Sequence, residues 1–193
     1  MDESRKNYIR EQAEIINQAS EKYQLIHAMF ALEKIFKDRR QAEYTQEYNA
    51  LREKLINTTD FEEKKKINEQ VKNLQVEGSR RIKILVEYIP QMKGNCARIV
   101  KTKGNVFMIY LPEEMKNIRD EDGTINFELL KNLRHLMAHE LGHITLHSGS
   151  LDSMAVYQME EKEEEAEYFA QQLIELRKQR NEEIHKNDNY QKI

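Results

Sequence analysis

The segment Leu136–His147, with the sequence LMAHELGHITLH, decides how the rest of the chain is interpreted. Together with His135 directly before it, the segment holds four of the six histidines of the protein. Apolar residues recur there at helical spacing, which predicts a helix from Asn126 to His147. His139 and His143 are four residues apart and therefore lie on the same face of that helix. Two imidazole nitrogens placed in this way can bind one metal ion.

Glu140 completes the pattern HExxH between these two histidines. About 100° of helical rotation separates it from His139, so its carboxylate lies beside the ion and can accept a proton from an attacking water. Gly142 costs the predicted helix about 1 kcal/mol relative to alanine, and a close approach of another element would explain it. The histidines flank an apolar stripe of Leu130, Leu133, Met137, Leu141 and Ile144. The segment therefore predicts a core helix with a metal site at its edge.

A third protein ligand is needed if one position on the ion is to stay open for water. An acidic run near the start of a second predicted helix, over residues 158–178, contains the candidates Glu163 and Glu165. The two glutamates flank an apolar stripe on opposite sides, and the helical period does not choose between them. The stripe consists of Ala166, Phe169, Ala170, Leu173 and Leu176.

The motif HELGHITLH followed by E-x-E-A-x-x-F-A, which ends at Ala170, resembles the ImmA/IrrE family of zinc metallopeptidases. The resemblance covers about residues 80–177, and the first 78 residues have no such likeness. It implies a zincin-like fold with a Zn²⁺ ion, although sites of two histidines and a glutamate also accept manganese or iron. The residues that it implies are the ligands His139, His143 and Glu163, the first glutamate of E-x-x-A, and the general base Glu140.

Two further residues are candidates for supporting a ligand or contacting a substrate. Glu167 occupies a position at which the family usually has asparagine or aspartate, one turn after the third ligand. His147 lies one turn after the HExxH motif. The family tends to continue after F-A with an apolar pair and Met-Pro, whereas this chain continues with QQLIELR. This departure concerns the substrate groove more than the metal site.

The composition excludes several classes of protein. The net charge is −3, which gives no reason to expect direct binding of nucleic acid. No apolar run approaches the eighteen residues of a membrane span, and the N-terminal residues do not form a secretory signal. The lone Cys96 forbids an internal disulfide and reads as a small core residue in a strand. We therefore expect a soluble, cytoplasmic protein.

The N-terminal part reads as helical, because no proline or glycine occurs before Gly78. Helical spacing predicts one long helix over residues 3–37, then a hairpin of helices over 41–57 and 60–77. Thr59 with Glu62 fits a capping box at the start of the second of these. Spacings of three and four in the hairpin are heptad-like, as in a coiled coil that binds a partner or a second copy of the chain.

The middle of the chain changes to the period of β-strands. Residues 81–89 alternate apolar and polar side chains as in a half-buried strand, with a helix as the alternative. Residues 96–102 and 105–111 flank a turn at Lys103-Gly104 and predict a hairpin. The fold class is therefore α+β, with a small antiparallel sheet of about three strands.

We expect three parts in the chain: a helical region over 1–78, a zincin-like metallopeptidase domain over 79–178, and a polar, frayed tail over 179–193. Other polar residues carry weaker expectations. His135 and His185 read as solvent-facing, whereas Tyr157 and Tyr168 are candidates for donating a hydroxyl to an oxyanion.

These observations predict an intracellular zinc endopeptidase. The resemblance implies a regulatory role, in which the enzyme cuts a helix-turn-helix repressor encoded nearby. The alternative is a non-proteolytic regulatory module with a structural or vestigial metal site, whose long N-terminal helices bind a partner.

Overall fold

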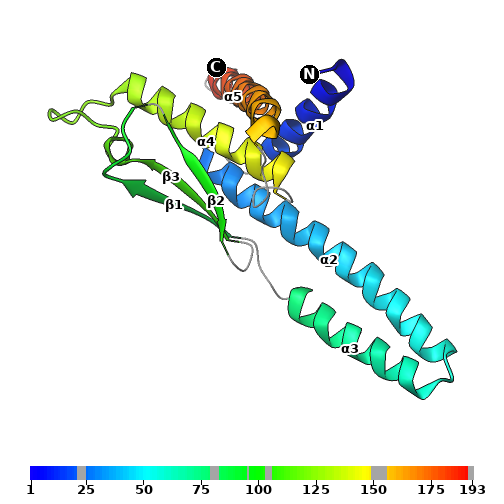
Figure 1. Ribbon diagram of the computed structural model, residues 1–193. Coiled ribbons are helices and arrows are strands. Elements are labelled where there is room, and N and C mark those ends of the chain that lie inside the picture. Colours follow the sequence, from blue (N-terminus) through cyan, green and yellow to red (C-terminus); the bar gives the residue numbers. More distant parts are fainter. Residues whose placement is uncertain (21–24, 79–82, 95, 103–105, 149–155, 191–193) are drawn as a thin grey trace.

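The computed structural model describes residues 1–20, 25–78, 83–94, 96–102, 106–148 and 156–190. These residues form helices and one small sheet, so the predicted α+β class is confirmed (Figure 1). The elements are α1 (Glu3–Ala19), α2 (Leu25–Asn57), α3 (Phe61–Gly78), β1 (Lys83–Ile89), β2 (Arg98–Thr102), β3 (Val106–Pro112), the 3₁₀ turn η1 (Glu113–Lys116), α4 (Phe127–His147) and α5 (Val156–Tyr190).

The sheet is mixed rather than antiparallel, with the strand order β1-β3-β2. β1 pairs with β3 in parallel, with Ile84 opposite Phe107, whereas β2 pairs antiparallel, with Ile99 opposite Ile109. β3 takes the centre because it is the most apolar strand: Phe107, Ile109 and Leu111 are all fully buried. A central strand pairs with a neighbour on each side and is therefore more buried than an edge strand. The half-exposed strands β1 and β2 lie at the two edges of the sheet.

The predicted strand over 81–89 and the predicted hairpin are both present as β1, β2 and β3. The helical alternative is therefore wrong for residues 83–89, and residues 81 and 82 lie outside the described part of the chain. The turn expected at Lys103-Gly104 lies outside the described residues.

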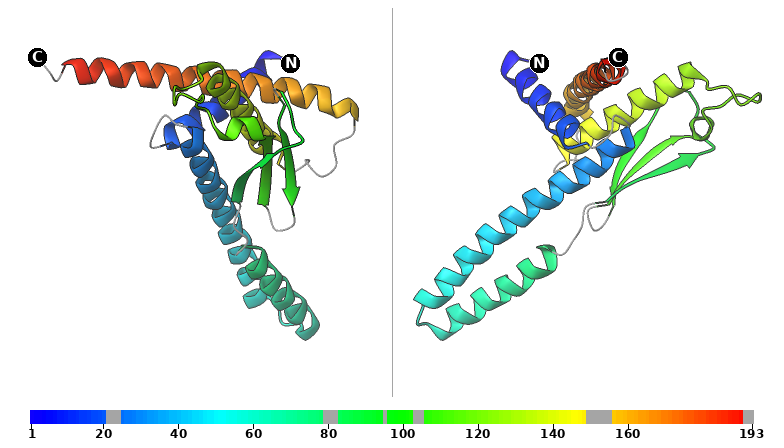
Figure 2. Two further views of the ribbon diagram at one scale, coloured as in Figure 1. Left: turned by 90° about the vertical axis from the view of Figure 1, so that its left-hand side faces the viewer. Right: turned by 180° about the vertical axis from the view of Figure 1, so that it is seen from behind.

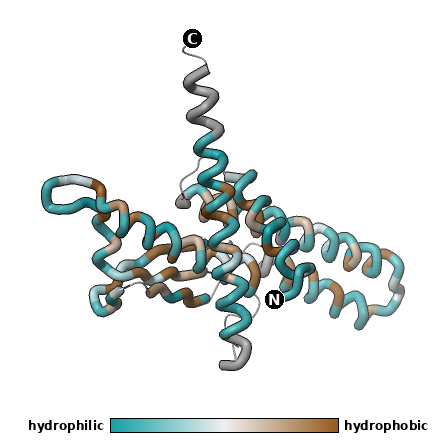
Figure 3. The backbone as a smooth tube through the Cα atoms, turned by 90° about the horizontal axis from the view of Figure 1, so that it is seen from above, coloured by the Kyte–Doolittle hydropathy of each residue, from teal (hydrophilic) through white to brown (hydrophobic). Residues whose placement is uncertain are grey.

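The core lies where α4 packs between the sheet and α5, with α1 and the beginning of α2 closing it (Figures 1 and 3). Residues on both sides of position 78 contribute to this one core. Its buried members include Ile9, Ala13 and Ile16 of α1, Ala28, Met29 and Leu32 of α2, Phe107, Ile109 and Leu111 of β3, Leu136, Met137, Ala138, Leu141 and Ile144 of α4, and Phe169, Ala170 and Leu173 of α5.

The expectation of one helix over residues 3–37 is wrong. α1 ends at Ala19, because Ser20 adopts an extended conformation. The carbonyl oxygen of Ser20 accepts a hydrogen bond from Arg180 of α5 at 2.8 Å, so a contact from far along the chain satisfies the end of the helix. α2, in contrast, runs without a break through residues 38–40.

Residues 37–78 form an arm in which the distal part of α2 pairs with α3 and projects from the core (Figures 1 and 2). Ile67 is buried between the two helices, and Tyr44 stacks on Tyr48 with ring centroids 5.9 Å apart. This is the predicted helical hairpin; its description as a coiled coil stays a prediction.

The cap at the start of α3 differs by one residue from the predicted pair of Thr59 and Glu62. Asp60 Oδ1 accepts a hydrogen bond from the backbone N–H of Glu63 at 2.8 Å. The carboxylate of Glu63 accepts a hydrogen bond from the hydroxyl of Thr58 at 2.6 Å. An aspartate caps a helix at least as well as a threonine, which explains why Asp60 takes the position.

Two expectations about the second half of the chain are also wrong. Cys96 is exposed rather than buried in a strand, because β2 begins only at Arg98. α5 does not end near residue 178 but continues to Tyr190, so most of the expected frayed tail is helical. No proline or glycine interrupts this stretch. None of the described helices is both long enough and apolar enough to cross a membrane.

α4 and α5 approach each other closely at Gly142. A Cβ atom placed there would lie 3.1 Å from Cα and from the carbonyl oxygen of Ala166, and 3.1 Å from Cδ1 of Phe169. Two of these three atoms belong to the backbone and yield only if α5 moves. The glycine in the helix therefore reflects the close approach that the sequence predicts.

We expect Gly142→Ala to destabilise the protein by roughly 1 kcal/mol. Overpacking of this kind costs about 1–3 kcal/mol, and the better helix propensity of alanine offsets up to about 1 kcal/mol of that cost. The melting temperature should fall by about 2–4 °C per kcal/mol. Lys131→Ala on the exposed face of α4 is the matched control. Equal melting temperatures for the two variants would contradict the role of Gly142.

Candidate metal centre

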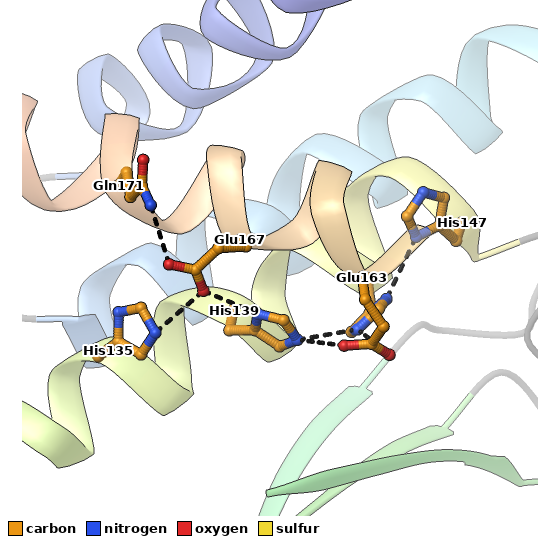
Figure 4. A network of polar contacts seen from close by, with 7 residues as sticks. His135, His139, His147, Glu163, Glu167 and Gln171 are labelled. Atoms are coloured by element: carbon orange, nitrogen blue, oxygen red, sulfur yellow. Dashed lines mark hydrogen bonds and ion pairs between the residues drawn. The ribbon is translucent and has the colours of Figure 1, made fainter. Parts of the chain in front are cut away.

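Three potential ligands from α4 and α5 meet at one point (Figure 4). His139 Nε2 lies 3.1 Å from His143 Nε2 and 3.0 Å from Glu163 Oε2, and His143 Nε2 lies 3.3 Å from Glu163 Oε1. One ligand atom from each residue fits within 4.8 Å of the others. The two histidines project from successive turns of α4, and the packing of α5 at Gly142 brings Glu163 to them.

The separations fit a zinc ion. Ligand atoms bound at about 2.0–2.1 Å with tetrahedral angles lie about 3.3 Å apart. The two histidine nitrogens are 3.1 Å apart, and each lies 3.0–3.3 Å from one of the two carboxylate oxygens of Glu163. The donor set, two imidazole nitrogens and one carboxylate, is also one that zinc commonly takes in catalytic sites. His139, His143 and Glu163 are therefore the residues that could hold the ion. Other divalent metals accept the same donors.

The triad of donors is open on one side. The side chain of His143 is 5% exposed, that of His139 is 17% exposed and that of Glu163 is 52% exposed. The triad is therefore shielded at His143 and accessible to solvent at Glu163.

Glu140 lies on the inner side of the site and is buried, with 4% of its surface exposed. Its Oε2 atom makes no hydrogen bond with any part of the chain that the structure describes. Burial, together with the negative charge of Glu163, raises the pKa of the Glu140 carboxyl to about 8. A cation bound at the triad would favour the ionised carboxylate and lower this pKa.

His143 is neutral in this environment, because burial lowers its pKa to about 4. Its second ring nitrogen, Nδ1, lies 3.2 Å from Nδ1 of His147, which is itself buried and has a lowered pKa. His147 Nε2 lies 2.8 Å from Glu165 Oε2. Arg5 binds both oxygens of that carboxylate at 2.6 Å.

Glu165 stays ionised within this set of contacts. Burial opposes ionisation, but the hydrogen bonds from Arg5 and His147 outweigh it and lower the pKa of the carboxyl. Of the two glutamates left open by the helical period, Glu163 therefore faces the histidines of the HExxH motif, and Glu165 faces His147.

Glu167 contacts the other side of His139. Its Oε2 atom lies 3.5 Å from His139 Nδ1 and 3.0 Å from His135 Nε2. Gln171 donates a hydrogen bond to its other oxygen at 3.0 Å (Figure 4). Glu167, which stands where the family usually has a shorter asparagine or aspartate, therefore contacts His139, and His135 faces Glu167 rather than only solvent.

The remaining candidates lie elsewhere. The hydroxyl of Tyr168 accepts a hydrogen bond from Arg10 of α1 at 2.9 Å, so it faces α1. The side chains of Tyr157 and His185 lie outside the described residues. Arg5 is the contact that sequence reasoning missed, since no local pattern links it to Glu165, 160 positions away.

In metal-free protein we expect Glu140→Gln to raise the free energy of unfolding at pH 7. The pKa of this carboxyl is about 8 in the folded protein against an ordinary 4.5. Stability is therefore lost as the pH rises from about 4.5 to about 8, where only the unfolded chain gives up the proton. Glutamine cannot ionise, so the variant avoids this loss, which is on the order of 3 kcal/mol of unfolding free energy at pH 7.

Urea unfolding of chelator-treated protein between pH 5 and pH 8 measures this effect. The difference between the variant and the wild type should be small at pH 5 and grow towards pH 8. His143 makes the opposite contribution below pH 6.5, but it is present in both proteins and cancels. A difference that does not depend on pH would contradict a buried, protonated Glu140.

Residues 132–191 match the family model of the IrrE N-terminal-like domain, Peptidase_M78. The matched segment contains α4 from residue 132 onward and all of α5, and therefore the whole triad. No curated protein and no solved structure matches the chain. The family match confirms the resemblance to ImmA/IrrE-type metallopeptidases for the part of the chain that forms the metal centre.

Proposed function

We propose that this protein is an intracellular zinc-dependent metallo-endopeptidase with a regulatory role. The observation that carries the proposal is the meeting of His139, His143 and Glu163 around one point, next to the buried carboxyl of Glu140. The match to a peptidase family model supports the same class of activity.

The exposure of the site favours catalysis over a purely structural metal. Structural zinc sites have four protein ligands and are closed, whereas catalytic sites have three and keep one position open. The part of the chain that the structure describes offers one group of three ligands here, and Glu163 is half exposed. A peptide can therefore approach the site from the side of Glu163.

The residues have separate roles in peptide hydrolysis. A zinc ion held by His139, His143 and Glu163 would supply Lewis acidity, which would polarise the scissile carbonyl and lower the pKa of a water so that it can give up a proton and attack. Glu140 Oε2 accepts the proton that the attacking water loses and donates it to the departing amine nitrogen. His139, His143 and Glu163 hold their donor atoms in place, and Glu167 orients the ring of His139.

We expect Glu140→Gln to retain zinc and to lose cleavage by about 10²–10⁴-fold, the usual contribution of a general acid–base group. His139→Ala should lose both zinc and cleavage, because it removes a ligand. Zinc content and cleavage of a protein substrate are measured on the same preparations. Full cleavage activity of Glu140→Gln would contradict the role of Glu140 as the general base.

We expect Glu163→Ala to weaken zinc binding by more than the ~10–100-fold that is typical for loss of a group that only supports a ligand. Glu164→Ala is the matched control, because Glu164 is adjacent and 59% exposed and does not face the histidines. Competition with a chromophoric chelator measures both affinities. Equal affinities of the two variants would show that Glu163 is not a ligand.

The substrate that we propose is a helix-turn-helix repressor encoded beside this protein, as the family resemblance suggests. Co-expression of the two, followed by mass spectrometry of the repressor, tests both the substrate and the bond cleaved. The Glu140→Gln variant is the control that separates this activity from host proteases.

A non-proteolytic binding module is the second candidate, and the arm of residues 37–78 favours it. Ile56 and Phe61 at the tip of the arm are 73% and 77% exposed. Large apolar side chains at an exposed tip suit a partner or a second copy of the chain. Protein that binds no zinc but forms a stable complex with an uncleaved partner would support this candidate.

A further inference from the structure

A continuous set of short contacts links the metal ligand His143 to the N-terminal helix α1. His143 Nδ1 lies 3.2 Å from His147 Nδ1, and His147 Nε2 lies 2.8 Å from Glu165 Oε2. Arg5 of α1 closes the set, with Nε and Nη2 each 2.6 Å from an oxygen of Glu165. Of these four residues, Arg5 lies outside the segment that matches the peptidase family model.

The direction of each hydrogen bond follows from the chemistry of the two ends. Glu165 is paired with a guanidinium and acts only as an acceptor, so His147 Nε2 carries a proton and donates it. In a neutral His147 with its proton on Nε2, Nδ1 is an acceptor, and it accepts the N–H of His143 Nδ1. The proton of His143 is thereby held on Nδ1. The lone pair of His143 Nε2 then faces the other two donors, His139 and Glu163.

We propose that Arg5, Glu165 and His147 are positioning residues of the metal centre, which fix the ring and tautomer of His143 so that α1 forms part of the site. The proposal rests on the proposed function in so far as the triad binds a metal. A neutral histidine that gives its second N–H to an acceptor is the arrangement in which histidine ligands are usually held.

Arg5 is needed because the three residues that it connects to the metal centre are buried. His143, His147 and Glu165 are 4%, 4% and 6% exposed, so solvent competes little for their hydrogen bonds. A buried carboxylate is costly without an opposite charge. Arg5 supplies this charge through a two-point contact that a lysine does not reproduce.

Other contacts place α1 on α5 independently of Arg5. Arg10 donates a hydrogen bond to the hydroxyl of Tyr168 at 2.9 Å. Arg180 donates to the carbonyl oxygens of Asn17 and Ser20 at the other end of α1. Ile9, Ala13 and Ile16 are buried in the core. A change at Arg5 therefore alters the metal centre without releasing the helix.

The test compares the zinc affinity of the full chain in four forms: wild type, Arg5→Ala, His147→Phe and the control Arg10→Ala. Arg10→Ala removes a contact of the same kind between α1 and α5 that does not lead to the ligands. We expect zinc to bind about 10–100-fold more weakly to Arg5→Ala and His147→Phe, and equally well to Arg10→Ala. Glu165→Gln, which removes the buried charge and keeps the shape, gives a second reading if Arg5→Ala folds poorly.

A direct measurement of the tautomer separates positioning from general stability. Long-range ¹H–¹⁵N spectra of metal-free protein should show the proton of His143 on Nδ1 in the wild type and in Arg10→Ala. His147→Phe should show a mixture of both tautomers. An unchanged tautomer in His147→Phe, or equal zinc affinities of Arg5→Ala and Arg10→Ala, would overturn the proposal.

The outcomes also distinguish this proposal from the proposed function. Wild-type protein that binds zinc but cleaves no protein would refute the proposed peptidase activity. In that case weaker zinc binding by Arg5→Ala would still support the proposal that Arg5, Glu165 and His147 position His143. Cleavage by the wild type with unaltered zinc binding by Arg5→Ala would refute the network alone. Absence of zinc binding by the wild type would refute both.

Discussion

The close packing of α4 on α5 is the constraint on which the rest of the structure depends. At Gly142 the backbones approach until a single added methyl group would lie 3.1 Å from the main chain of Ala166. This approach brings Glu163 within 3.0–3.3 Å of the two histidine nitrogens. A small displacement of α5 would lengthen these distances, and metal sites tolerate little such change. The glycine that weakens α4 as a helix thus allows α4 to serve as one wall of the site.

Much of the site could be predicted because its parts are local in sequence. His139 and His143 are placed by the geometry of one helix, which the pattern of apolar residues predicts. The choice between Glu163 and Glu165 was not local, because it depends on how α5 is rotated against α4. That rotation is set by packing at Gly142 and Phe169, which a helical period does not encode.

The errors about the fold have the same origin. Hydrophobic periodicity predicts that β1, β2 and β3 are strands, but the order β1-β3-β2 depends on which of them is buried most completely. The end of α1 at Ala19 is likewise stabilised by Arg180, more than 150 residues away. Local signals predict the elements of this chain, and contacts between distant elements decide their order and their ends.

Two buried glutamates near the metal centre have opposite surroundings, and this difference assigns their roles. Glu165 is paired with Arg5 and His147, so its charge is compensated and its position is fixed. Glu140 is as deeply buried, yet its Oε2 atom has no hydrogen-bond partner among the described residues. A compensated carboxylate is stable but unreactive, since protonating it would break its contacts. An uncompensated carboxylate gains and loses a proton without breaking any contact at that oxygen. In the proposed mechanism the contacts of Glu165 hold a ligand in place. The Oε2 atom of Glu140 is available to take up a proton once a cation at the triad favours the ionised carboxylate.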